Sequence, residues 1–114
     1  MNKMLKPLAI AATLIATLAP ASAAEPTTAD PAYRVMTVYT LYGKLQQCDN
    51  IDPLRAEAVT VAIVNKAKSE APYIDAGYLW RKAQTGPYMG QPSREDCKVY
   101  CQNLLDIANG AVFQ

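Results

Sequence analysis

Three cysteines are the residues of this chain best suited to covalent chemistry, and they stand at positions 48, 97 and 101. Cys97 and Cys101 are four residues apart, so on one helix face their Cβ atoms would lie about 5 to 6 Å apart. A relaxed disulfide needs a Cβ separation of roughly 3.5 to 4.5 Å. Any internal bridge must therefore include Cys48, and both Cys97 and Cys101 stay open as its partner.

Any such bridge leaves one cysteine over. We predict that it lies on an apolar helix stripe as a small hydrophobic residue. Two alternatives stay open: a mobile disulfide, in which Cys97 and Cys101 compete for Cys48, and an intermolecular bridge that makes a covalent dimer. A thiol-redox enzyme is poorly supported, because Glu95 and Asp96 disfavour a thiolate at Cys97. The C-x-x-x-C spacing also differs from that of the thioredoxin-type pair.

Two groups of side chains are candidate metal ligands. The three thiolates, together with Met36 or Met89, would suit Cu(I). Asp49 and Asp52 gather oxygen ligands for a hard cation in one turn, but the turn lacks the Gly and the terminal Glu of an EF-hand loop. We therefore interpret Asp52 first as a helix cap. Metal binding through the thiolates or the acidic turn is the alternative function, and otherwise we expect no cofactor.

Composition and motifs argue against several classes of function. The chain carries 11 Lys and Arg against 10 Asp and Glu, unlike the strongly basic footprint of a nucleic-acid-binding protein. It contains no His, the commonest general base and transition-metal ligand. The sequence holds no nucleophile elbow, P-loop, dinucleotide fingerprint or zinc-protease motif. We predict a protein that is not an enzyme and binds no nucleic acid.

Residues 1–23 show the three-part pattern of an export signal. A basic head with Lys3 and Lys6 precedes an apolar run over residues 8–18, which is short for a bilayer span. A small-residue tail follows and ends at Ala23. We predict cleavage after Ala23, with a cut after the next residue as the alternative. The mature chain would then reach a periplasm, or the outside of the cell, where disulfides persist, and would not insert into a membrane.

Helical periodicity predicts one all-α domain over residues 31–110, a small bundle of three to four helices. Asp-Pro pairs at 30–31 and 52–53 and a Ser at 93 are N-cap signals. Pro72 either separates the two central segments or bends one helix. Residues 24–30 are predicted as a flexible lead-in with nothing to bury, and 111–114 as a tail. The predicted helical segments are 31–47, 53–71, 73–84 and 94–109.

Two of these helices carry apolar stripes that we expect to face the core. The expected inward side chains of the second segment are Leu54, Ala58, Val61, Ala62, Ile63 and Ala67. Those of the last segment are Cys97, Tyr100, Cys101, Leu104, Leu105 and Ala108. Because Cys48 ends the first helix, its disulfide would tie the first helix to the last.

The loop over residues 85–92 is the candidate contact surface. Tyr88 and Met89 stand between Gly and Pro residues with no helical face to cover them, a composition suited to a rigid contact loop. The alternative is that both fold back over the end of the bundle. We predict protein binding of an accessory, chaperone or immunity type. The expected partner is another exported or envelope protein, or a second copy in a homodimer.

Overall fold

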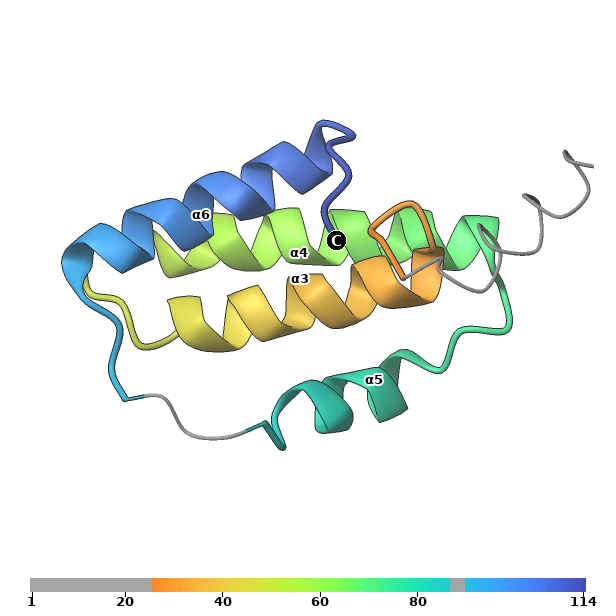
Figure 1. The fold of residues 1–114 in the computed structure, drawn as a ribbon, viewed down its shortest axis with the longest axis horizontal. Helices are drawn as coiled ribbons and strands as arrows, with labels where there is room; N and C mark the ends of the chain where they lie inside the picture. Colours follow the sequence, from red (N-terminus) through yellow and green to blue (C-terminus); the bar gives the residue numbers. More distant parts are fainter. Residues whose placement is uncertain (1–25, 87–89) are drawn as a thin grey trace, which may run out of the picture.

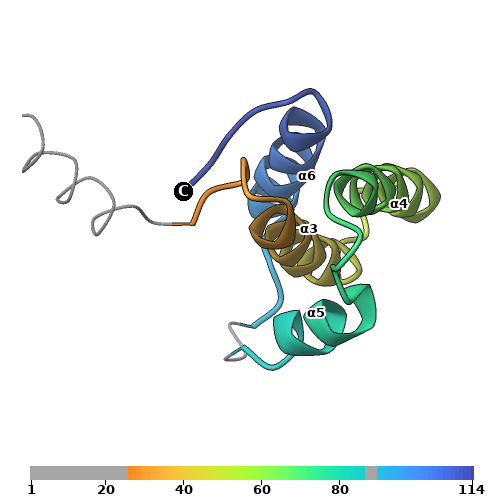
Figure 2. The same ribbon diagram turned by 90° about the vertical axis from the view of Figure 1, so that its right-hand side faces the viewer.

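The computed structural model describes residues 26–86 and 90–114. Within this part of the chain all regular structure is helical, in the order α3 (Pro31–Leu45), α4 (Pro53–Glu70), α5 (Ala76–Ala83) and α6 (Arg94–Ala108). The predicted all-α bundle of three to four helices is confirmed. α3 lies at the centre and packs against the other three, α4 also packs against α6, and α5 lies on the far side of α3 from α6 (Figures 1 and 2).

α3, α4 and α6 begin at the capping residues that the sequence indicates. Asp30 accepts a hydrogen bond from the Ala32 amide, Asp52 caps α4 in the same way, and Ser93 accepts one from the Asp96 amide. Each cap satisfies an amide that the first helical turn leaves without a partner.

Across the described ranges, no helix has the combined length and apolarity needed to cross a membrane.

Pro72 separates α4 from α5, so the two central segments are distinct helices and not one bent helix. Ala71 leaves the helical region with φ −140° and ψ 83°, because the ring of a following proline disfavours helical geometry at the residue before it. α5 then starts at Ala76, later than predicted, where the Asp75 carboxylate accepts a hydrogen bond from the Tyr78 amide.

The core consists of two neighbouring clusters that share α3 and α4. One lies between α3, α4 and α6 and contains Val38, Leu41, Leu45, Ala56, Ile63, Leu104 and Ile107. The other lies where α5 approaches α3 and α4 and contains Val35, Val64, Ala67, Ala71 and Ile74. Next to it, Trp80 packs edge-on against Tyr39, with 5.2 Å between ring centroids. Burial raises the pKa of the Tyr39 phenol.

The predicted inward face of α4 is partly wrong. Leu54 is 75% exposed and Val61 50% exposed, and Ala58 and Ala62 are exposed as well. α4 has apolar residues on two arcs, and periodicity alone cannot tell which of them α3 covers. The arc that α4 buries consists of Ala56, Thr60, Ile63, Val64 and Ala67. On α6, Cys97, Leu104 and Ile107 are buried, whereas Ala108 is exposed.

The expectation that the lead-in has nothing to bury is wrong at Thr28, which is only 2% exposed. Its amide donates to the Phe113 carbonyl at 2.9 Å, and its hydroxyl accepts from the Phe113 amide at 2.7 Å and donates to the Ala111 carbonyl at 3.2 Å. Thr28 therefore ties the lead-in to the C-terminal tail. The two segments are 85 residues apart, so no local pattern in the sequence indicates this contact.

Two buried threonines lead to opposite predictions. Replacing Thr28 by Val removes both side-chain hydrogen bonds and leaves the Phe113 amide without its acceptor, so we expect a loss of about 1 to 2 kcal/mol in the free energy of unfolding.

The Thr60 hydroxyl is buried and has no hydrogen-bond partner within the described residues. Thr60→Val should therefore leave stability unchanged or raise it by up to about 1 kcal/mol. Urea unfolding of both variants checks the two signs, and equal losses would contradict these contacts.

Candidate functional site

A disulfide joins Cys48 to Cys97, with 6.0 Å between their Cα atoms. Cys48 lies three residues beyond the end of α3, and Cys97 lies in the first turn of α6. The predicted tie between the first and last helices is thus confirmed, and Cys97 is the partner of Cys48. An intramolecular disulfide of this kind belongs to an oxidising, non-cytoplasmic compartment.

Cys101 is the free cysteine. It lies one turn beyond Cys97, is half-buried, and packs against the cluster between α3, α4 and α6. This position agrees with the prediction of a small hydrophobic residue on an apolar stripe, although its burial is incomplete. A mobile disulfide and a covalent dimer through Cys101 stay alternative hypotheses.

The candidate metal ligands have other partners in this structure. The sulfur atoms of Cys48 and Cys97 are bonded to each other. The Asp49 carboxylate accepts a hydrogen bond from the Arg94 guanidinium at 2.9 Å, and the Asp52 carboxylate caps α4. Within residues 26–86 and 90–114, no group of three or more Cys, Asp or Glu side chains could hold a metal ion.

The predicted contact residues Tyr88 and Met89 lie outside the described residues. Two other tyrosines, Tyr73 before α5 and Tyr78 within it, are exposed. Both tyrosines therefore lie at α5, on the far side of α3 from α6.

A pocket of about 510 Å³ lies between α4, the end of α6 and the two terminal segments, and no motif in the sequence indicates it. Its apolar side chains come from α4, α6 and the tail, and its charged side chains from α3 and α4. The side chains that shape it are those of Thr28, Arg34, Ala62, Ile63, Lys66, Glu70, Ile107, Ala108, Asn109 and Val112. The sequence does not indicate this pocket, because its lining forms only where Thr28 of the lead-in and Val112 of the tail meet α4.

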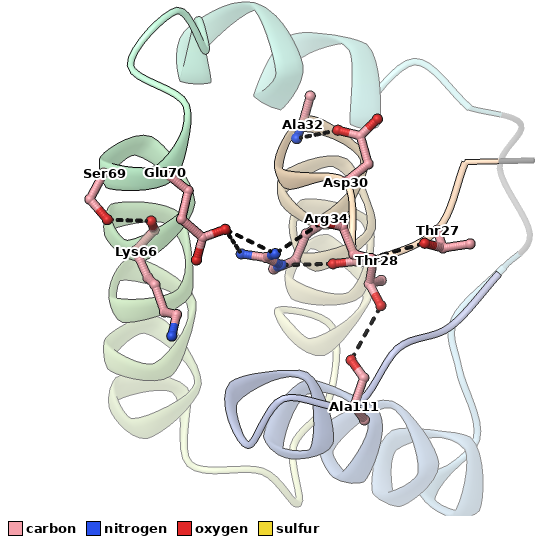
Figure 3. Close-up of polar contacts among 10 residues, drawn as sticks. Thr27, Thr28, Asp30, Ala32, Arg34, Lys66, Ser69, Glu70 and Ala111 are labelled. Carbon is pink, nitrogen blue, oxygen red and sulfur yellow. Dashed lines mark hydrogen bonds and ion pairs between the residues drawn. The ribbon is translucent and has the colours of Figure 1, made fainter.

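Arg34 lines this pocket, and Figure 3 shows its side chain between Glu70 of α4 and the lead-in at Thr28. Its guanidinium forms an ion pair with the Glu70 carboxylate at 3.2 Å. It also donates to the Thr28 carbonyl at 2.8 Å and to the Ala29 carbonyl. Arg34 thus fastens the lead-in to both α3 and α4. With most of its donors already engaged, it acts as a fixed wall of the pocket.

The pocket lining combines charged groups with apolar surface. Lys66 contributes an ammonium group. The apolar contact area comes mainly from the exposed Ala62, Ala108 and Val112, because Ile63 and Ile107 are each only 5% exposed. Among the described residues that line the pocket there is no cysteine, serine or aspartate that could act as a nucleophile beside a general base. Such a lining is suited to binding an anionic and partly apolar group.

An exposed apolar row runs along α4 beside the pocket. We call Leu54, Ala58, Val61 and Ala62 the α4 outer row. Their positions follow the i, i+4, i+7, i+8 pattern of one helix face, and all four are exposed. Ala62 belongs to both the row and the pocket lining. The row and the pocket therefore form one continuous surface.

Comparison of the chain with protein-family models, with curated proteins and with solved structures finds no match.

Proposed function

We propose that this is a small exported, non-enzymatic protein that acts by binding another protein, in an accessory, chaperone or immunity role. The observation that carries the proposal is the α4 outer row, which exposes Leu54 and Val61 on a helix whose opposite face is buried. A contiguous exposed apolar surface marks an interaction site more often than a scattered apolar residue does. The partner would be another exported or envelope protein.

The cross-linked frame supports this proposal. The Cys48–Cys97 disulfide holds the end of α3 to the start of α6, and Arg34 holds the lead-in to α4 at the other end of the molecule. A surface that is already rigid loses less conformational entropy when it binds. The frame therefore favours binding through a preformed surface.

The proposed compartment is the periplasm or the cell exterior. Residues 1–23 carry an export-signal pattern, and a stable disulfide needs an oxidising environment. Both features fit a binding partner that is itself exported or held in the envelope.

Site-specific photo-crosslinking in cells tests the proposal. A photoreactive residue is placed at Val61 in the outer row, or at Val99 on α6, which is the matched control because the two valines are 50% and 52% exposed. We expect a discrete adduct from position 61 and none from position 99, with a mass that identifies the partner. Ala58→Glu should reduce that adduct about tenfold, because it buries a charge in the contact.

Two outcomes would contradict protein binding through this face. One is the absence of any adduct from position 61, and the other is the same set of adducts from both positions. An adduct with twice the mass of the mature chain would identify a second copy as the partner.

A further inference from the structure

The α4 outer row lies at the edge of the bundle, and charged side chains border it on both sides. Figure 2 shows α4 at one side of the molecule, with no helix beyond it. At about 3.6 residues per turn, Glu57 and Lys68 lie about three turns apart on one border of the row. Both side chains are exposed, and neither forms an ion pair within the described residues. This border therefore carries a free acid near its start and a free base near its end.

Such a border is complementary to itself in the antiparallel direction. When a second copy of α4 lies antiparallel against the row, the twofold axis between the helices brings each border against the same border of the other copy. Glu57 of one copy then comes level with Lys68 of the other, and the symmetry forms this contact twice. Both contacts form only when the axis passes level with the midpoint between the two residues, next to Ala62. The charges therefore specify one register.

The opposite border fits the same register. It carries Arg55 near its start and Glu70 near its end, and the midpoint of this pair lies at the same place along α4. Arg55 thus comes level with Glu70 of the second copy, whose carboxylate already holds Arg34. Lys66, the remaining cation on this side, comes level with the uncharged Val59. Charges of opposite sign come level on both borders, and within α4 no like charges do.

The apolar side chains of the row meet near the axis in this register. Val61 and Ala62 lie beside the axis and Ala58 lies one turn away, so small side chains let the two helices approach closely. Leu54 meets the last turn of the second α4. The contact covers Leu54 and Val61, which are 75% and 50% exposed, and removing apolar surface from water stabilises the pair.

We propose that the free protein forms a twofold dimer in which two α4 helices pair antiparallel through the α4 outer row. A contact between identical faces requires a surface that is its own complement, and the charges along α4 meet this requirement. One pair of helices makes a small contact, below about 1,200 Å², so we expect a dissociation constant on the order of 100 µM. The inference goes beyond the proposed function: a second copy covers the row in the free protein, and a partner that binds the row more tightly replaces it.

Sedimentation equilibrium of the mature, oxidised protein between about 10 µM and about 1 mM measures the dimer. We expect a reversible change from monomer to dimer over this range. The Cys101→Ala variant should dimerise with the same constant, because the proposed contact is not covalent. Amide chemical shifts of ¹⁵N-labelled protein should change with concentration at Ala58, Val61 and Ala62, and not at Val99, which is exposed on α6.

Two charge reversals test the register. Glu57→Lys and Lys68→Glu each bring like charges together twice in a dimer of one variant, so each should weaken dimerisation at least about tenfold. An equimolar mixture of the two variants restores opposite charges at both contacts, and its mixed dimer should be within about threefold of the unchanged protein. Lys98→Glu makes the same change at an exposed position of α6 and should leave the constant unchanged. Circular dichroism confirms that each variant is folded.

Three results would overturn the inference: a protein that stays monomeric at about 1 mM, a dimer that is lost in Cys101→Ala, or a mixture that dimerises no better than the separate variants. A monomer in solution, together with a partner captured from position 61 in cells, would reject only the dimer. A dimer in solution, with only a second copy captured from position 61 in cells, would reject instead the proposed exported partner.

Discussion

Replacing Cys97 by alanine is expected to lower the free energy of unfolding by about 4 kcal/mol and the melting temperature by roughly 15 °C or more. The disulfide joins residues 49 positions apart, so it removes a large part of the conformational freedom of the unfolded chain. A domain of this size has a total stability of roughly 5 to 10 kcal/mol. The loss is therefore a large fraction of the whole.

The measurement is reversible thermal or urea unfolding of the oxidised protein, with Cys101→Ala as the control. Cys101 forms no bridge and is half-buried, so its replacement should cost less than about 1 kcal/mol. The double variant Cys97→Ala/Cys101→Ala prevents Cys101 from taking over as the partner of Cys48. A loss at Cys101→Ala as large as that at Cys97→Ala would show that the assigned pairing is wrong.

The other contacts between the end of α3 and the start of α6 cannot replace the stability that the disulfide contributes. Arg94 and Asp49 form an ion pair at 2.9 Å, but both side chains are mostly exposed. An exposed pair of this kind contributes about 0 to 1 kcal/mol. Asn50 adds one hydrogen bond to the Arg94 carbonyl. Lys44 also lies over the Tyr100 ring, 5.7 Å from its centroid. Each of these contacts is individually weak, so the disulfide is the strongest single link between the end of α3 and the start of α6.

Where α3, α4 and α6 begin could be predicted from the sequence because capping is local. Asp30, Asp52 and Ser93 accept hydrogen bonds from amides only two or three residues ahead, and Pro is tolerated only in the first turn. The stop at Pro72 is local for the same reason. Signals of this range are fully contained in a short window of sequence, so an outline of three to four helices was predictable.

The partner of Cys48 and the inward face of α4 both depend on contacts between distant segments. Local patterns therefore left the partner of Cys48 open and predicted the inward face of α4 only in part. Spacing excluded a Cys97–Cys101 bridge but could not say which turn of α6 meets the end of α3. On α4, Leu54 and Val61 have the hydrophobicity of core residues, yet α3 covers the arc that contains Ala56, where small side chains permit close packing.

The pocket was unpredictable for a related reason. Thr28 and Arg34 near one end of the described chain and Val112 near the other meet at α4 through a set of polar contacts. No motif marks any of these residues, because each acts only through partners that are remote in the sequence. A single Arg on a predicted helix gives no sign that its donors hold a terminal segment in place.

A pair of identical substitutions separates the two faces of the bundle. Leu104→Ala is expected to lower the free energy of unfolding by about 3 kcal/mol, since Leu104 is 1% exposed in the cluster between α3, α4 and α6 and its removal leaves a cavity. Leu54→Ala should change it by less than about 0.5 kcal/mol, because Leu54 is 75% exposed.

Urea unfolding at a constant slope gives both values. Since the chemical change is the same in the two variants, the difference between them measures burial and not hydrophobicity. Equal losses would mean that Leu54 belongs to the core, as the periodicity of α4 predicts, and the α4 outer row could then not be a binding surface. A small loss at Leu54 together with an unchanged fold would leave its side chain available to a partner.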